Sequence, residues 1–591
     1  MNEMEVKKED ENSNRILLEE TFYVLTKKNC VFRVRLTRKG LCLIKESEHN
    51  IKEQLIPIRD IIGSRCLRSK KQSRQCVCHS IPRSSSLEVV EESSLELDDS
   101  DSSAYLYIYA YIFQNSKASN KRRERTIITL RFRSFDKYED NNKEAQRWRM
   151  VLKKLIRGET ISNASIAGFT LSHKHKENKR LLVLCNPKSG KGKGKQIFQQ
   201  KVAPVLQEAE IPFDLYLTKH ANFAREFVRT SNLFQWSGIL SVGGDGILFE
   251  VINGIFERWD WSEIIKSIPV GVVPGGSGNG LARSIAHYYS EPYLPTPYLP
   301  SALAAVRNDY APMDLVRVET NVQIMFSFLS VGWGLLSDID IESERLRLFG
   351  GQRFVIWSIA RLIGLRSYGG KLWYLPSDVP PASTRDYHSS TLNIGSNLDL
   401  PAEVNLETQT GRPRVDSWYS ANSRKSAYFS TTCSSYQSTS DSAAGDVPAA
   451  TEKPRMYGPA PQIPCLPAPL PSTWKCISGR FVMVHASYQS HLGEDLFFAP
   501  EATLNDGRIW LLIVHAGATR SQLLHFLLGL STGAHAVSKS QEGAIELLPV
   551  RAFRIEPDEG ETGYMTVDGE QVEYGPIQAE IFPSLGRIMV P

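Results

Sequence analysis

Ser241-Val-Gly-Gly-Asp-Gly-Ile-Leu-Phe-Glu250 decides the fold of the central part of the chain. The apolar run that ends at Ser241 is typical of a short buried strand, and residues 247–259 carry apolar side chains at helical spacing. The glycines around Asp245 are therefore expected where a strand turns into a helix. Glycine lets a ligand approach the backbone, and a helix start offers unpaired N–H groups to phosphate. Asp245 is placed to accept a proton from an attacking hydroxyl, although an N-capping aspartate is the plainer alternative.

Two more glycine-rich turns follow apolar strands. Residues 186–195 follow the run 181–185, and residues 274–280 follow the run 270–273, each leading into a helical pattern. Three such junctions predict a parallel sheet whose loops converge at the carboxyl ends of its strands. Open α/β sheets bind ligands at that edge.

Length, charge and cysteine content set broad limits. A chain of 591 residues is longer than one hydrophobic core usually supports, so more than one domain is expected. Its net charge of +5 is compatible with anionic partners but does not require them. Nine cysteines suit a reducing compartment better than a disulfide framework. The charged first residues do not resemble a signal peptide, and no apolar run approaches the ~20 residues of a membrane span. These features predict a cytoplasmic protein, soluble or attached peripherally to membranes.

The N-terminal part is expected to form a small β domain. Residues 1–19 are expected to be disordered, and residues 20–157 contain short strands followed by a helix that carries Trp148. This order is similar to that of a pleckstrin-homology-like barrel, which would imply docking on a phosphoinositide or a protein; a scaffold without lipid affinity is the alternative. The polar, Ser-rich residues 70–101 predict a disordered loop.

The rest of the chain divides by pattern. Residues 176–310 alternate strands and helices and predict the α/β nucleotide-binding domain. Residues 311–378 and 471–591 contain strands at hairpin spacing, which predict an antiparallel β-sandwich or barrel. Residues 379–470 are rich in Ser, Thr and Pro and are expected to be a disordered insertion.

Other phosphate-binding readings fit poorly. Gln196 stands where a P-loop would carry its Mg²⁺-binding hydroxyl, which argues against a Walker-type ATPase. The second strand ends in Thr218-Lys219-His220, without the acidic ribose partner of a Rossmann site. The lysines of residues 188–195 lie inside a strand–loop–helix unit, so a nucleic-acid site is not expected.

Three stretches carry a family resemblance: Asn186-Pro-Lys-Ser-Gly-Lys-Gly, Gly243-Gly-Asp-Gly-Ile-Leu-Phe-Glu-Val-Ile-Asn-Gly254 and Pro274-Gly-Gly-Ser-Gly-Asn-Gly-Leu-Ala282. Together they resemble the catalytic domain shared by diacylglycerol, ceramide and sphingosine kinases. Trp333 to Glu344 and the terminal Val567-Asp-Gly-Glu570 are similar to sphingosine kinases in particular. The resemblance covers residues 180–376 and 474–591.

The resemblance implies roles for matching residues. Asp245 would be the catalytic base, and Gly243, Gly244, Gly246 and Asp340 would contact the lipid substrate. ATP with Mg²⁺ would be the phosphoryl donor. The implied nucleotide-binding residues are Asn186, Pro187, Lys188, Thr218, Lys219, His220, Glu250, Gly276, Ser277, Gly278, Arg347, Arg353, Asp568, Gly569 and Glu570.

Asp340 is the residue that the resemblance ties to substrate choice. Its carboxylate would pair with the ammonium of a long-chain amino alcohol. The plainer alternative is an acidic solvated turn, because Asp338 and Glu342 stand beside it. Two apolar helical stretches, residues 354–363 and 523–530, are expected to line a pocket for the lipid chain, although such stretches are more often core.

The sequence therefore predicts an ATP-dependent kinase of sphingosine and related sphingoid bases that associates peripherally with membranes. A ceramide kinase is the alternative within the class, and a catalytically inactive membrane adaptor with the same fold is the alternative outside it. The basic amphipathic segment 353–368 is of the type that calmodulin binds.

Overall fold

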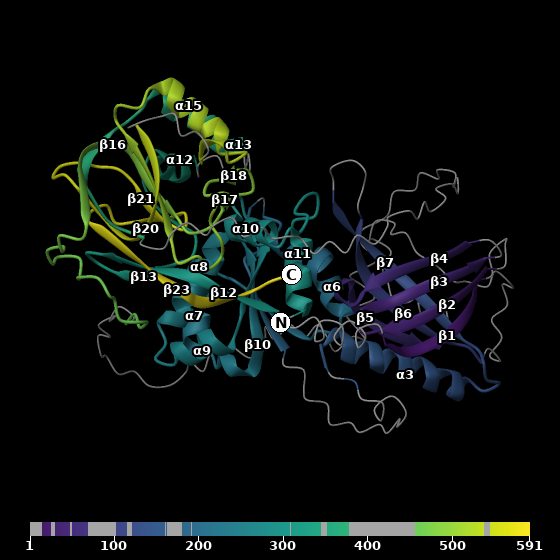
Figure 1. The fold of residues 1–591 in the computed structure, drawn as a ribbon. Coiled ribbons are helices and arrows are strands. Elements are labelled where there is room, and N and C mark those ends of the chain that lie inside the picture. Colours follow the sequence, from purple (N-terminus) through teal and green to yellow (C-terminus); the bar gives the residue numbers. More distant parts are fainter. Residues whose placement is uncertain are drawn as a thin grey trace, which may run out of the picture. The chain divides into compact units, whose positions relative to one another are not determined.

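The computed structural model describes residues 15–24, 30–47, 50–68, 102–114, 121–159, 161, 180–190, 192–307, 309–343, 352–377, 455–536 and 544–591. These described residues form two compact units, one from residues up to 161 together with 205–211, and the other from the remainder (Figure 1). Each unit has its own hydrophobic core.

Two small antiparallel sheets and one helix make up the first unit. The elements are β1 (Ile16–Val24), β2 (Cys30–Thr37), β3 (Gly40–Ser47), β4 (Asn50–Pro57), β5 (Ile61–Leu67), β6 (Ala104–Gln114), β7 (Arg122–Phe132) and α3 (Tyr138–Ile156). Strands β1 to β4 form one sheet and β5 to β7 the other. The expected β domain with a closing helix is therefore present, although β1 begins inside the segment that was expected to be disordered. The predicted loop at residues 70–101 lies outside the described residues.

Trp148 joins these elements. Its ring centroid lies 6.1 Å from that of Phe22 on β1 and 6.1 Å from that of Phe132 on β7. Val151 and Leu152 are buried beside it on α3. Aromatic edge-to-face contacts of this kind stabilise a small core beyond the area they bury, so the helix pattern around Trp148 was a correct signal of packing.

The second unit begins as a parallel α/β arrangement. Its elements here are β8 (Arg180–Cys185), α5 (Gly194–Ile197), α6 (Ala203–Glu208), β9 (Phe213–Leu217), α7 (Phe223–Thr230), β10 (Trp236–Gly243), α8 (Asp245–Phe256), α9 (Trp261–Ser267), β11 (Val270–Pro274), α10 (Gly280–Tyr288) and α11 (Tyr298–Arg307). Strands β9, β8, β10 and β11 are parallel neighbours. Cys185 pairs with Val242, and Gly243 pairs with Pro274. The three glycine-rich turns therefore start from one level of the sheet, as the sequence predicts.

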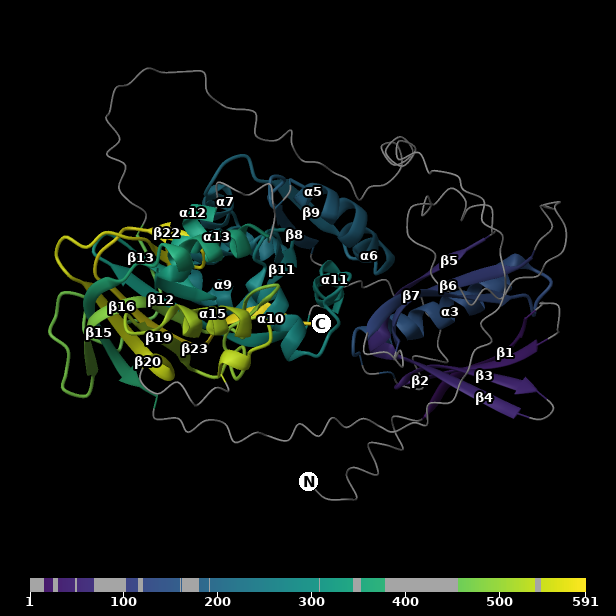
Figure 2. The same cartoon turned by 90° about the horizontal axis from the view of Figure 1, so that it is seen from above.

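The remaining strands are mostly antiparallel. They and their helices are β12 (Tyr310–Thr320), β13 (Ile324–Ser327), β14 (Ser330–Gly334), α12 (Leu335–Ser343), α13 (Gln352–Ile363), β15 (Tyr368–Pro376), β16 (Lys475–Ser487), β17 (His491–Gly493), β18 (Leu496–Phe497), β19 (Ile509–His515), α15 (Arg520–Gly529), β20 (Ile545–Pro557), β21 (Met565–Val567), β22 (Glu570–Val572) and β23 (Ile577–Met589). Helices α12 and α13 lie side by side in both views (Figure 2).

Strand β23 connects the two kinds of sheet. It pairs antiparallel with β12 and β20, and at its end Ile588 pairs parallel with Val270 of β11. A single mixed sheet thus contains both the parallel strands β8 to β11 and the mostly antiparallel strands that follow them in the sequence. The C-terminal residues return to the α/β part, which the pattern of the sequence did not predict.

The predicted insertion is shorter on its C-terminal side than expected. Residues 378–454 lie outside the described residues, but residues 455–474 follow a defined path. Tyr457 N donates to Phe256 O at 2.7 Å, and the guanidinium of Arg554 donates to the carbonyl oxygens of Cys465 and Ala468. The expectation of disorder up to residue 470 is wrong for this stretch, because buried polar groups of the sheet bind its backbone.

Candidate active site

Asp245 lies where β10 passes into α8. Gly243 adopts a φ of +156°, and Gly244 N donates to Ser189 Oγ in the first glycine turn at 2.9 Å. Asp245 Oδ2 accepts a hydrogen bond from Gly280 N, the first residue of α10, also at 2.9 Å. The carboxylate is therefore fixed by the start of a second helix, where unpaired amides favour negative charge.

The other oxygen of Asp245 accepts no hydrogen bond from the residues that the structure describes. Asp245 Oδ1 is buried and has no hydrogen-bond partner among the described residues. Burial raises the pKa of Asp245, while the backbone amides of Gly280, Leu281 and Asn279 act in the opposite direction. A carboxylate that is held in place and keeps one oxygen unsatisfied has the geometry of a proton acceptor.

The three glycine turns touch each other through their backbones. A methyl group on Gly276 would lie 2.4 Å from Gly244 Cα, and one on Gly190 would lie 2.6 Å from Gly275 O. Gly275 N donates to Gly243 O at 2.9 Å. Side chains are excluded from these contacts, so the sequence prediction that the turns converge is correct.

Asn279 is a residue that the sequence analysis did not single out. It adopts a left-handed conformation with φ +59°, and its Oδ1 accepts from Gly276 N at 2.9 Å. Its Nδ2 donates to Glu494 Oε1, on the far side of the turn, at 3.0 Å. Asparagine tolerates left-handed geometry and bonds locally to backbone, and its position inside a glycine-rich loop was the available signal.

The first turn and the end of β9 hold the next predicted group. Asn186 Oδ1 accepts from Lys188 N at 3.0 Å, which shapes the turn around Pro187. Thr218 N donates to Cys185 O at 2.9 Å, so the tripeptide 218–220 begins level with the end of β8. Lys219 and His220 are exposed. Their placement at this edge agrees with a role beside a nucleotide without testing it.

Glu250 extends from α8 toward α7. Its Oε1 accepts from Asn222 N at 3.0 Å and its Oε2 from Ala224 N at 2.9 Å. Burial raises the pKa of this carboxyl, and the backbone amides of Asn222, Ala224 and Arg225 act in the opposite direction. Glu250 thus stabilises the start of α7, a role that the sequence analysis did not foresee.

Asp568, which the resemblance implies as a nucleotide-binding residue, has its carboxylate occupied by other parts of the protein. Its carboxylate accepts from Ser327 Oγ at 2.6 Å, Leu329 N at 2.9 Å and Ser330 N at 2.9 Å through Oδ1, and from Phe328 N at 3.1 Å through Oδ2. The residue is only 4% exposed. Both oxygens are committed to the turn between β13 and β14, so Asp568 holds protein backbone instead of a ligand.

The next two residues do reach the site. A methyl group on Gly246 would lie 2.5 Å from Glu570 Oε1, and one on Gly569 would lie 3.2 Å from Asp340 Oδ2. The carboxylate of Glu570 therefore borders the turn that begins α8, and that of Asp340 lies beside Gly569. Arg347 lies outside the described residues; Arg353 falls in α13, but the structure describes nothing of its side chain.

Comparisons with known proteins agree with this geometry. The diacylglycerol kinase catalytic domain matches residues 180–318, and the YegS C-terminal NAD kinase beta sandwich-like domain matches residues 474–590. The chain is 35% identical to sphingosine kinase 2 of Homo sapiens in an alignment of 525 residues that covers 79% of this chain and 79% of that protein. It is 34% identical to human sphingosine kinase 1 over 68% of this chain and 89% of that protein.

The chain belongs to the sphingosine kinase family. Sphingosine kinase 1 of Arabidopsis thaliana is 30% identical over 67% of this chain and 69% of that protein. A solved structure described as a putative diacylglycerol kinase from Bacillus anthracis str. Sterne aligns with 70% of this chain and 97% of that one at 14% identity and a TM-score of 0.40, a similarity too low to support an argument.

As a lipid kinase of this family the protein uses ATP, and the residues present fit a triphosphate. Asp245 is bordered by three glycine turns and by the first residues of α8 and α10. These segments offer backbone N–H groups to phosphate, and their glycines leave the approach free of side chains. A magnesium ion would be held by Glu570 together with the phosphates, as Mg²⁺ takes few protein ligands. Within the described ranges no group of three His, Cys, Asp or Glu side chains forms a metal site.

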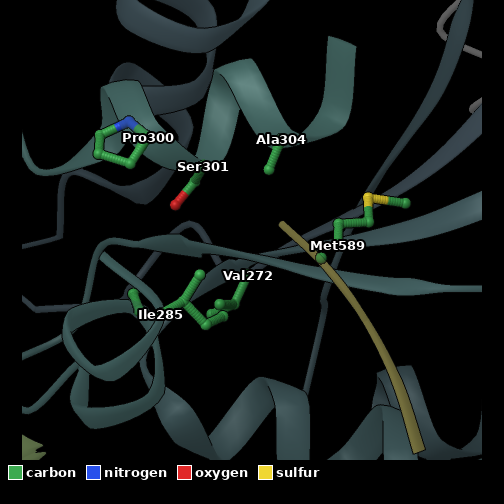
Figure 3. A pocket seen from close by; sticks show the side chains of 8 residues that line it. Val272, Ile285, Pro300, Ser301, Ala304 and Met589 are labelled. Atoms are coloured by element: carbon green, nitrogen blue, oxygen red, sulfur yellow. The ribbon is translucent and has the colours of Figure 1, made fainter. Parts of the chain in front are cut away.

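A small cavity lies elsewhere in this kinase. Gly271 and Val272 of β11, Ala282 and Ile285 of α10, three residues of α11 and Met589 of β23 line it (Figure 3). Ser301 supplies the one side-chain hydroxyl in this lining. None of the predicted site residues lines this cavity, so no prediction for ATP or lipid rests on it.

Proposed function

We propose that this protein phosphorylates the primary hydroxyl of sphingosine and related sphingoid bases with ATP. The observation that carries the proposal is Asp245, whose Oδ2 is fixed by Gly280 N while Oδ1 is buried without a partner in the described part of the chain. A substrate hydroxyl that donates to Oδ1 would satisfy this oxygen. As the oxygen attacks the γ-phosphate of ATP, Asp245 would accept its proton.

Asp340 would select an amino alcohol. In a sphingoid base the ammonium sits on the carbon next to the one that bears the reacting hydroxyl, so the two carboxylates that bind these groups must lie near each other. The side chain of Glu570 lies close to Gly246, and Asp340 Oδ2 lies close to the preceding residue, Gly569, which supports a short distance between Asp340 and the turn that carries Asp245. A carboxylate–ammonium pair is strong where water is excluded, and a ceramide amide carries no charge to form it.

The lipid chain would lie against the apolar layer between the antiparallel sheet and helices α12 and α15. Leu335 and Ile339 of α12 and Leu523 and Phe526 of α15 are buried in one cluster there. Ile363, Leu524 and Leu528 are exposed large hydrophobic residues of α13 and α15, which supports peripheral contact with a membrane. None of the described helices is long and apolar enough to cross one.

Three further expectations stay predictions. They are calmodulin binding by the segment 353–368, a pleckstrin-homology-like docking function of the first unit, and a cytoplasmic location. Trp357 Nε1 donates to Glu342 Oε2 at 2.8 Å, and Arg361 also pairs with Glu342, so calmodulin would have to compete with these contacts.

The test measures phosphoryl transfer from labelled ATP to sphingosine, ceramide and diacylglycerol. We expect transfer to sphingosine alone. The Asp340→Asn variant should raise the KM for sphingosine at least about tenfold, because it loses one charge-assisted pair, and leave the KM for ATP unchanged. Transfer to ceramide in preference to sphingosine, or equal changes in both KM values, would contradict the assignment of Asp340.

A further inference from the structure

His485 is a buried polar side chain for which the described part of the chain supplies no hydrogen-bond partner. It lies on β16, is 6% exposed, and neither ring nitrogen has a hydrogen-bond partner in the ranges that the structure describes. Its ring lies 5.1 Å from the ring of Phe498. Burial lowers the pKa of His485 to about 4, so the imidazole is neutral near pH 7. An unsatisfied buried polar group is costly, and native proteins rarely keep one without a use.

Two hydroxyl groups lie beside this histidine. Ser337 Oγ of α12 and Thr566 Oγ1 of β21 are 2.9 Å apart and bonded to each other. A methyl group on Gly332 would lie 2.5 Å from Ser337 Oγ, 2.9 Å from Thr566 Oγ1 and 2.8 Å from His485 Nδ1. Three hydrogen-bonding atoms from separate elements thus converge over a residue that has no side chain.

The hydrogen-bonding capacity of the three groups is not exhausted. Two hydroxyls carry two protons, and only one proton lies between Ser337 and Thr566; a neutral imidazole adds one donor and one acceptor. A secondary alcohol would complete the arrangement, because it can accept from a hydroxyl and donate to the imidazole at the same time. A purely apolar chain would leave both ring nitrogens of His485 without a partner among the described residues.

Ser337 also lies close to Asp340 along α12. Ser337 precedes Asp340 by three residues on α12, so the two lie one helical turn apart on similar faces. The surroundings are the apolar layer that we assign to the lipid chain, which includes Leu335, Ile339, Met483, Phe498 and Leu512.

We propose that His485, Ser337 and Thr566 form a subsite for a secondary hydroxyl of the sphingoid base, one or two carbons from the carbon that bears the ammonium. This inference rests on the proposed function, since it needs the ammonium at Asp340. Two hydroxyls have this chemistry, one on the third carbon of all common sphingoid bases and one on the fourth carbon of the 4-hydroxylated bases.

Three substrates separate the two sources. The kcat/KM is measured for 3-deoxysphinganine, sphinganine and 4-hydroxysphinganine, in wild type and in His485→Leu, which replaces the imidazole by an apolar group of similar size. If the subsite binds the hydroxyl on the third carbon, the kcat/KM of wild type should be about tenfold or more higher for sphinganine than for the 3-deoxy base. If it binds the hydroxyl on the fourth carbon, the kcat/KM should be higher by the same factor for the 4-hydroxy base than for sphinganine. His485→Leu should remove that preference. Thr566→Val should reduce it.

Thermal unfolding separates this role from a structural one. Removing an unsatisfied buried polar group should leave the stability of His485→Leu unchanged or higher. His525→Gln, an exposed position on α15, is the matched control and should keep every wild-type ratio. Equal kcat/KM values for the three bases in wild type, or a wild-type ratio in His485→Leu, would overturn the subsite. Absence of transfer to any sphingoid base would instead refute the proposed function.

Discussion

Whether an aspartate of this site can bind a ligand depends on whether its carboxylate oxygens already accept hydrogen bonds from the protein. Asp245 and Asp568 both follow a strand in a glycine-containing turn, and the family resemblance implied ligand contacts for both. Asp245 keeps Oδ1 without a partner in the described structure, whereas Asp568 accepts four hydrogen bonds from residues 327–330. The sequence identifies the residue types but not the distant turn that Asp568 holds, because those contacts span about 240 positions.

Asp568 should make stability depend on pH. Burial raises its pKa to about 7 in the folded protein, as it does for Asp314. Between pH 4 and pH 7 the folded state therefore binds more protons than the unfolded state, so the free energy of unfolding falls as pH rises. Urea unfolding at pH 5 and pH 7 should show a drop of about 1–3 kcal/mol for each such group.

The Asp568→Asn variant is the control for that slope. An amide cannot titrate, so the variant should lose part of the drop. It should also be less stable at both pH values by about 1–3 kcal/mol, because its NH₂ group would face Phe328 N–H. An unchanged pH slope in the variant would show that Asp568 is ionised throughout this range.

At the scale of elements, the strand–turn–helix junctions were the most predictable feature. Each combines an apolar strand, glycines and a helical period within about 20 residues, and such local patterns are read directly from sequence. The pairing of Cys185 with Val242 and of Gly243 with Pro274 then sets the turns level. The contacts of Glu250 with residues 222 and 224 and of Asn279 with Glu494 were not predictable, because these partners are distant in the sequence.

Gly276→Ala tests the contact between the turns. Its methyl group would lie 2.4 Å from Gly244 Cα, so the turns must separate and the phosphate site must shift. We expect kcat/KM for ATP to fall on the order of 100-fold while the protein stays folded. Gly517→Ala is the matched control, as its methyl group meets nothing within 4 Å. A Gly276→Ala enzyme with wild-type kinetics would show that the turns do not shape the site.

At the scale of the second unit, β23 joins the parallel strands and the antiparallel strands into one sheet. The alternating and hairpin patterns were separable in the sequence, but the return of the last strand to β11 was not, because sheet order between distant strands leaves no local signal. Ile588, Met589 and Val590 are all buried at this junction. Residues 379–470 are predicted as one disordered insertion because they are rich in proline and serine. This composition gives no signal of the backbone contacts that residues 455–474 make with the sheet and with α8.

Removal of residues 588–591 should therefore destabilise the α/β part. Three buried apolar side chains contribute about 1.5–3 kcal/mol each, so the loss should exceed about 4 kcal/mol, a large share of the stability of an ordinary domain. Circular dichroism during heating would report a strongly lowered Tm. Removal of Pro591 alone should have little effect. A truncated protein with the wild-type Tm would contradict the role given to β23.

The central claim is that Asp245 accepts the proton of the lipid hydroxyl, and Asp245→Asn tests it most directly. Single-turnover transfer from labelled ATP to sphingosine should slow by a factor on the order of 100 to 10,000, because a positioned general base contributes that much. Equilibrium binding of ATP should stay within a few-fold of wild type. Transfer at close to the wild-type rate by the asparagine variant, with ATP bound normally, would contradict the account.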